Sequence, residues 1–125
     1  MSENQAKKVV VTFVDEEGFL FAKATGQWNL ASVKNAVTEI RDEAVKRKYH
    51  GVLIDIREVE GSPSLMERHE LGLHVVNQTR GVLKGAIFIR GAATDKHLEN
   101  VVTNRGAKIL FTPDREEAVH WLLAD

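Results

Sequence analysis

The charged residues best placed to form a site follow two apolar runs of the chain. The first run is Gly51–Ile56 and the second is Lys84–Ile89, and polar side chains come at or just after the end of each. In open α/β sheets, ligands bind beyond the carboxyl ends of parallel strands. If both runs are parallel strands, their ends meet at one edge and form a polar rim for a partner or a ligand. The candidate rim residues are Asp55, Arg57, Glu58 and Arg90.

A second interpretation of the same residues is structural. A buried carboxylate needs hydrogen-bond partners, so Asp55 can accept from loop amides or can pair with Arg57 or Arg90. This interpretation requires no ligand, and the sequence favours it over the binding rim. Both interpretations place Asp55 at the carboxyl edge of the predicted sheet.

Two serines precede a segment of helical spacing over residues 62–78. Ser64 with Glu67 matches the capping box S-x-x-E, and Ser62 followed by Pro63 fits an alternative cap. Either serine would lie at a helix N-terminus, where an added phosphate is electrostatically favoured. Ser64 and Ser62 are therefore candidate phosphorylation sites, although helix capping alone explains both residues.

No catalytic or metal-binding motif stands out in the sequence. The chain has no cysteine, which excludes disulfides and thiolate nucleophiles. His69 and His74 are five residues apart, which does not match the i, i+4 pair of a helical metal site. A serine–histidine–acid triad is defined in space rather than in sequence, so an enzyme stays open as a third alternative. We expect no enzymatic activity, no metal ion and no cofactor.

Composition predicts one globular domain over residues 1–125, with residues 1–7 flexible. The 125 residues are 43% hydrophobic and 28% charged, and the formal net charge of -1 opposes nucleic-acid binding through the field of the whole molecule. The longest apolar runs fall far short of the roughly 20 residues of a spanning helix, and the first eight residues lack the apolar stretch of a signal peptide. We therefore expect a cytoplasmic location, no nucleic-acid partner and no membrane insertion.

The first third of the chain predicts a β-hairpin followed by a long helix. Val9–Val14 and Phe19–Thr25 are rich in residues that favour strands, a turn at Gly18 joins them, and Gly26 is expected to end the second strand. Asn29 is the expected N-cap of a helix that stops before Gly51.

Trp28, just before this cap, has two interpretations. As a hydrophobic staple it would pack on Val33. If it lies on the surface instead, it is a candidate contact in a homodimer.

Strands and helices alternate over the rest of the chain, which predicts an α/β fold. Leu65, Leu73 and Val76 are the expected inward residues of the second helix, and Thr112 and Pro113 are expected to be the N-cap and first residue of the last helix. The predicted architecture is a mixed sheet of about five strands with an N-terminal hairpin, parallel central strands and about four helices. The expected later elements are a strand at 51–56, a helix at 62–78, a strand at 84–89, a helix at 95–104, a strand at 107–111 and a final helix.

This order of elements resembles the STAS domain, the module of sulfate transporters and anti-sigma-factor antagonists. More narrowly, it resembles the small bacterial proteins that are grouped as similar to the sporulation anti-sigma-factor antagonist. Two motifs carry the resemblance, Gly51-Val52-Leu53-Ile54-Asp55-Ile56 and the segment from Phe111 through an acidic stretch to Ala118 and Trp121-Leu122. The resemblance extends over roughly Val9 to Leu123.

The resemblance implies a candidate switch. In phosphorylated antagonists, an anti-sigma-factor kinase modifies a serine at the start of the second helix, within the motif Asp-Ser-Ser-Gly-Leu. Ser64 occupies the corresponding position here, but Pro63 replaces the aspartate and Leu65-Met66 replace Ser-Gly. The chain therefore lacks the family motif around its candidate phosphoserine.

Two classes of function follow from this resemblance. The first is a non-enzymatic STAS-like regulatory module that binds another protein through the edge from Asp55 to Ser64, the second helix and the Arg90 loop. The second is a carrier or sensor of a small apolar or anionic ligand, because the same broad fold resembles the CRAL-TRIO lipid-transfer domain. A large apolar pocket between the second helix and the sheet would favour the carrier. A flat or convex edge would favour the protein partner.

Overall fold

The computed structural model describes residues 8–90 and 96–124, so the expectations for residues 1–7 and for a helix start at Asp95 lie outside the described residues. The predicted order ββαβαβαβα is confirmed. The elements are β1 (Val9–Asp15), β2 (Leu20–Gln27), α2 (Leu30–Lys46), β3 (Gly51–Glu60), α3 (Leu65–Thr79), β4 (Lys84–Phe88), α4 (Lys96–Asn104), β5 (Ile109–Thr112) and α5 (Arg115–Leu123).

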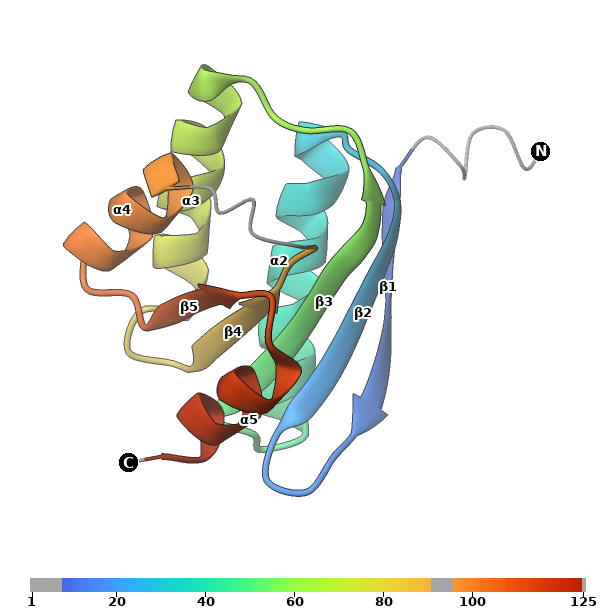
Figure 1. Cartoon of the computed structure of the whole chain (residues 1–125), viewed down its shortest axis with the longest axis vertical. Helices are drawn as coiled ribbons and strands as arrows, with labels where there is room; N and C mark the ends of the chain where they lie inside the picture. Colours follow the sequence, from blue (N-terminus) through green and yellow to red (C-terminus); the bar gives the residue numbers. More distant parts are fainter. Residues whose placement is uncertain (1–7, 91–95, 125) are drawn as a thin grey trace.

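One five-stranded sheet runs in chain order, β1-β2-β3-β4-β5. β1 and β2 form the antiparallel hairpin, and every later pair of neighbours is parallel. The crossover helix α2 lies on one face of the sheet and α5 covers the other (Figure 1). The mixed sheet with parallel central strands that the sequence predicted is therefore confirmed.

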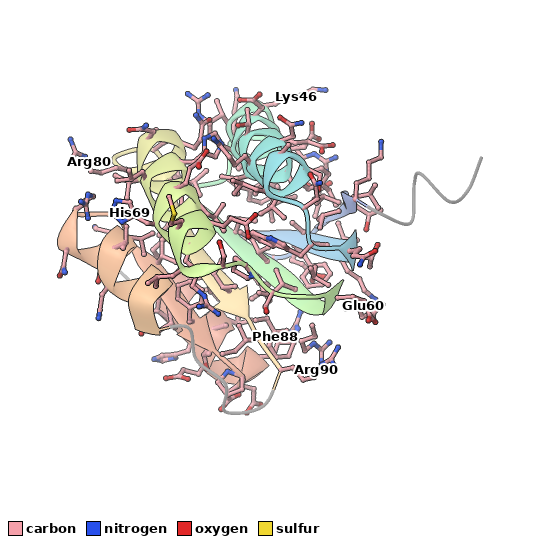
Figure 2. All side chains as sticks on the ribbon, turned by 90° about the horizontal axis from the view of Figure 1, so that it is seen from above. Lys46, Glu60, His69, Arg80, Phe88 and Arg90 are labelled. Atoms are coloured by element: carbon pink, nitrogen blue, oxygen red, sulfur yellow. The ribbon has the colours of Figure 1, made fainter. Side chains whose placement is uncertain are left out.

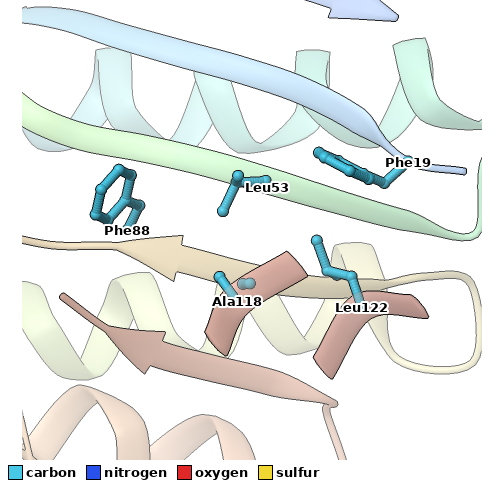
Figure 3. Close-up of a cluster of buried hydrophobic side chains, with 6 residues drawn as sticks. Phe19, Leu53, Phe88, Ala118 and Leu122 are labelled. Atoms are coloured by element: carbon cyan, nitrogen blue, oxygen red, sulfur yellow. The ribbon is translucent and has the colours of Figure 1, made fainter. Parts of the chain in front are cut away.

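The face under α5 is tightly closed. Leu53 and Ala86, in the middle of β3 and β4, have no exposed surface there. Phe19 and Phe88 surround them, and Ala118 and Leu122 of α5 pack on top (Figure 3). Ala118 and Leu122, which belong to the second motif of the resemblance, are thus core residues, and Trp121 packs half-buried at the margin of this cluster.

The opposite face, under α2, α3 and α4, is packed less completely. Ile54 and Ile87 lie next to Leu53 and Ala86 in the same strands, yet they are only partly buried. The core on this side is divided into three separate clusters. Two of them join α2 to β1, β2 and β3, and the third joins α3 to α4 and β5. The helix layer therefore does not close over the centre of the sheet.

Polar contacts hold α2 beside α3. The Lys34 ammonium lies 3.0 Å from a Glu70 carboxylate oxygen. One turn further along, Thr38 Oγ1 is hydrogen-bonded to His74 Nε2 at 3.1 Å. The closest backbone neighbours of α3 are α2 and α4, and α3 reaches the sheet through side chains such as Val76, which packs with Ile109 of β5.

Two of the three predicted helix caps are confirmed. The Asn29 side chain accepts from the Ser32 amide at 3.0 Å, and Ser64 forms a complete capping box with Glu67. Ser62 is therefore not the cap.

The third cap was assigned to the wrong residue. The last helix begins after Asp114, whose carboxylate accepts from the Glu116 and Glu117 amides. Thr112 remains the last residue of β5, where it is buried, pairs with Phe88, and accepts from the Asp114 amide. Pro113 consequently precedes the helix rather than opening it.

The predicted inward face of α3 was partly wrong. Leu65 is 62% exposed and Leu73 is 37% exposed, whereas Val76 is buried as expected. The capping box starts the helix at Leu65, which therefore lies in the exposed first turn. The buried face is instead formed by Leu71, Gly72, Val76 and Thr79.

Two strand ends also differ from the prediction. β2 passes through Gly26 to Gln27, and β3 continues to Glu60 rather than ending at Ile56. Gly26 has a φ of 120° and lies between partners on both sides, Val9 of β1 and Val59 of β3. A glycine can adopt this conformation without breaking the strand.

We expect Gly26→Ala to lower the free energy of unfolding by more than the roughly 1–3 kcal/mol that strained backbone alone costs. A Cβ at this position would lie 2.0 Å from the Lys8 carbonyl oxygen. Gly81→Ala is the matched control, because Gly81 has a φ of 76° and an added Cβ there would meet no other atom within 4 Å. Urea unfolding measures both variants, and equal losses would show that the close approach at Gly26 is unimportant.

Candidate functional site

A β-bulge shapes the carboxyl end of β3. Lys23 of β2 pairs with Asp55, but Thr25, two residues later, pairs with Glu58, three residues later. β3 therefore carries one extra residue at this point, and such bulges bend a strand and redirect its side chains. The candidate rim predicted from the sequence is built around this irregularity.

Asp55 and Arg57 form a bidentate ion pair across the bulge. Arg57 Nε lies 3.0 Å from Asp55 Oδ1, Arg57 Nη2 lies 3.0 Å from Oδ2, and the Arg57 amide also donates to Oδ1. The guanidinium stacks 4.0 Å from the centre of the Phe88 ring. Because Asp55 is only 3% exposed, its hydrogen bonds match the structural interpretation of this residue.

The pKa of Asp55 reflects two opposing effects. Burial raises the pKa of the carboxyl. Hydrogen bonds from Arg57 and the positive charges of Arg57 and Lys23 together lower it by more than burial raises it, so the net pKa lies below its ordinary value. The same pairing raises the pKa of Arg57. Asp55 is therefore held as a carboxylate and is unsuited to act as a general acid near neutral pH.

Arg90 and Glu58 complete the predicted rim. Arg90 Nη2 donates to the Arg57 carbonyl, which joins the ends of β4 and β3. Figure 2 looks onto this edge, with Glu60 and Arg90 labelled at the two strand ends. Glu58 instead pairs with Lys23 at 2.9 Å, in an exposed position. The structure thus brings Asp55, Arg57 and Arg90 into direct contact and leaves Glu58 beside them.

Trp28 connects the start of α2 with the start of α3. Its amide donates to the Glu60 carbonyl at 2.7 Å, and its indole Nε1 donates to Glu67 Oε1 at 3.3 Å. Glu67 Oε1 also accepts from the Ser64 amide, and these bonds lower the pKa of Glu67, that from Ser64 most. Trp28 is half-buried, and its role as a dimer contact stays a prediction.

Ser62 and Ser64 are both exposed at the start of α3. The Ser64 hydroxyl accepts from the Glu67 amide at 3.2 Å, so its structural role is the cap. Leu65 and Met66 follow it and are among the most exposed apolar residues of the described chain, at 62% and 83%.

A cavity of about 760 Å³ lies between α2, α3 and the sheet. Its lining is mostly aliphatic, with Ile54, Ile87 and Ile109 on the sheet, Val37 on α2, and Leu71 and Val75 on α3. The exposed lining residues are Arg57, in the last part of β3, Gly61 and Ser62, just after β3, and Arg90, just after β4, which places the opening at the edge just described. Two of the four candidate rim residues, Arg57 and Arg90, therefore lie at the mouth of an apolar cavity, whereas Asp55 and Glu58 are outside its lining.

The lining of this cavity was not identified residue by residue from the sequence. A usable signal was present, because several inward positions carry small residues. Ala24, Ala36 and Gly85 come from three different elements, yet all contribute to the lining. A small residue is common in any single strand or helix. The cavity forms because these three residues lie on the same face of the folded sheet and helix layer.

Neither a metal cluster nor a membrane span is found in residues 8–90 and 96–124. No group of three or more histidine, cysteine, aspartate or glutamate residues there could hold a metal ion. No helix of that part of the chain is long and apolar enough to cross a membrane.

The comparisons with known proteins identify the fold. No family model matches, and neither does any curated protein. Among solved structures, an anti-sigma-factor antagonist from Mycobacterium paratuberculosis matches with a TM-score of 0.63 and 14% identity, over 94% of this chain and 96% of that one. An uncharacterized protein with a SpoIIAA-like fold from Shewanella loihica matches with a TM-score of 0.53 and 21% identity, over 92% and 93% of the two chains. The predicted STAS-like fold is thus confirmed.

We expect Asp55→Asn to lower the free energy of unfolding at pH 7 by about 1–3 kcal/mol, because the charge-assisted pair with Arg57 is lost. At pH values above the ordinary aspartate pKa of about 3.9, the ionised carboxylate stabilises the fold. This contribution is lost as the pH falls through the lower pKa that Asp55 has in the folded state. The difference between the wild type and the variant should therefore shrink below about pH 4.

Denaturant unfolding at several pH values measures this difference. Glu58→Gln removes an exposed pair in the same strand and should cost under about 1 kcal/mol. A loss for Asp55→Asn that stays constant down to pH 2 would contradict the assignment of the stability to the ionised carboxylate.

Proposed function

We propose that this chain is a STAS-like module that binds a small apolar or anionic molecule, as a carrier or a sensor. The observation that carries this proposal is the apolar cavity between α2, α3 and the sheet. A large apolar pocket between the second predicted helix and the sheet was the feature expected of a carrier rather than of a purely protein-binding module. We further propose that the module acts without catalysis and in the cytoplasm.

The size and chemistry of the cavity fit a ligand. Its volume of about 760 Å³ falls within the roughly 300–1,000 Å³ typical of small-molecule pockets. Ile54 and Ile87 keep part of their surface exposed although they lie in central strands. A bound apolar group would remove that surface from water, with a gain of roughly 25 cal/mol per Å².

The construction of the helix layer also supports a ligand. α2 packs on β1, β2 and β3, whereas α3 packs on α4 and β5. Polar side chains join the two groups along α2 and α3. Polar contacts of this kind can be exchanged for water at little cost, so the two groups can separate slightly when a ligand enters.

A protein-binding regulatory module is the second candidate function. It is supported by the likeness to the anti-sigma-factor antagonist and by the surface at the start of α3. Leu65 and Met66 are exposed there beside the candidate phosphoserine Ser64, and exposed apolar side chains often mark contact sites. In this function the partner is another protein, and a homodimer through Trp28 is an alternative assembly.

We expect Val37→Trp to weaken binding of a neutral solvatochromic dye such as Nile red by about tenfold or more, because the indole fills space that lies on the cavity side of α2. Val45→Trp is the matched control, since Val45 is on the same helix but is 51% exposed and outside the lining. Dye fluorescence and native mass spectrometry with the bound dye measure the two affinities.

Thermal unfolding shows whether each variant is folded. If Val37→Trp proves unstable, Val75→Phe fills the same cavity from α3. Absence of dye binding by the wild type, or equal binding by the cavity and control variants, would refute the ligand-binding function.

Ser64 tests the second candidate. Ser64→Ala should lower the free energy of unfolding by about 1 kcal/mol because the cap is lost, whereas Ser64→Asp should retain it. If the serine is a switch, the protein isolated from its own cells should carry phosphate at Ser64, and Ser64→Asp should change the recovery of a co-purifying protein. Unmodified Ser62 and Ser64 in every growth condition, with equal recovery by both variants, would contradict the switch.

A further inference from the structure

We infer that the ligand is a single-chain amphipathic molecule with an anionic head group, and that the head lies at the arginine-rich mouth of the cavity with the aliphatic chain directed inward. This inference rests on the proposed ligand-binding function and adds the chemical class and the orientation of the ligand. A carboxylate and a phosphate monoester share the required chemistry.

The charged residues of the lining are all arginines. They are Arg41, Arg57, Arg68 and Arg90, and no carboxylate contributes to the lining within the described residues. Asp55 lies outside the lining and balances the charge of Arg57, whose guanidinium stacks on Phe88 of the cluster under α5, so the mouth depends mainly on Arg68 and Arg90. Arg90 donates to a neutral carbonyl, so its charge is not balanced by that contact. An apolar cavity whose charged groups share one sign favours a ligand of the opposite sign.

The backbone adds to this positive potential at the mouth. The crossover helices run antiparallel to the strands, so α2 and α3 both begin at the edge where β2 and β3 end. Helix N-termini carry partial positive charge and favour anions. The first turn of α2 contains no acidic residue. The first turn of α3 contains Glu67, but the Ser64 amide and the Trp28 indole both donate to its carboxylate.

The inner end of the cavity has few groups that could pair with an anion. Ile40, Leu83 and Val102 are buried there, and Gly85 contributes only backbone. Thr79 is the polar residue at this end, and its hydroxyl already donates to the Val75 carbonyl at 2.7 Å. An aliphatic chain fits these surroundings, whereas a charged head could pair only with Arg41, which follows Ile40 on α2.

Arg41 marks the alternative position for the head. Its Nη1 pairs with Asp42 at 3.2 Å, but its Nε is buried without a partner. It lies on α2 beyond Thr38, further from the mouth than Arg90. A head bound between α2 and α3 would depend on Arg41, and a head bound at the mouth would depend on Arg90 and Arg68.

The test compares dodecanoate, dodecyl phosphate and dodecanol as competitors of Nile red, each below its micelle-forming concentration. We expect at least one of the two anions to bind about tenfold or more tightly than the alcohol, because a charge-assisted hydrogen bond is available to it. The relative affinities of the two anions distinguish a carboxylate from a phosphate head.

Arginine variants then locate the head. Arg90→Gln should weaken the preferred anion by roughly tenfold and leave the alcohol unchanged, and Arg41→Gln should weaken it less. Arg105→Gln, an exposed arginine outside the lining, is the charge-matched control. Arg68→Gln gives a second readout at the mouth if Arg90→Gln alters the fold.

The outcomes separate this inference from the function on which it rests. Equal affinities for the anions and the alcohol would overturn the anionic head while the proposed function stands. A larger loss for Arg41→Gln than for Arg90→Gln would overturn the orientation. Failure of Nile red and of all three competitors to bind would refute ligand binding itself.

Discussion

Because β2, β3, β4 and β5 are parallel neighbours in chain order, each connection between them has to cross the same face of the sheet. Within the described residues, three helices therefore share that face, and α5 is the helix that covers the other. Because none of these crossover helices shares the face of α5, that helix can pack directly on the strands. Leu53 and Ala86 beneath it are completely buried. The three crossover helices must also fit against one another, and here they leave the centre of the sheet uncovered.

The same topology determines where a site can form. Parallel strands end where their crossover helices begin, so polar strand ends and helix N-termini come together at one edge. In this chain, the bulge at the end of β3 allows Arg57 to fold back on Asp55 and to stack on Phe88. Arg90 then ties β4 to β3. Two members of this network, Arg57 and Arg90, also line the cavity, so the contacts that join β3 and β4 lie directly beside its mouth.

The elements were predictable because their signals are local. The β-branched hairpin strands, the Asn29 cap and the Ser64–Glu67 capping box each depend on a few consecutive residues. The cap of α5 was not predictable in the same way. Thr112 and Asp114 are both good caps, and the choice depends on Thr112 pairing with Phe88 in the sheet.

Long-range packing explains the other differences. The helical spacing of α3 correctly indicates an amphipathic helix, but neighbouring elements decide which of its apolar residues face inward. Leu65 is exposed in the first turn of α3, and Leu73 stays outside the cluster through which Val76 packs on α4 and β5. The cavity follows from the same arrangement, since it depends on small residues from separate elements that meet only in the folded chain.

Trp28 contacts both the proposed ligand cavity and the proposed protein-binding surface at the start of α3. Trp28 contributes to the lining of the cavity, and its indole donates to Glu67, the residue that completes the capping box with Ser64. A ligand at the mouth and a protein bound at the start of α3 would therefore contact one connected group of side chains. If either event shifts that group, the two binding equilibria are coupled, and the coupling has to be equal in both directions. Under that condition a filled cavity would change the affinity for a protein partner, and the carrier and regulatory interpretations would describe two states of one module.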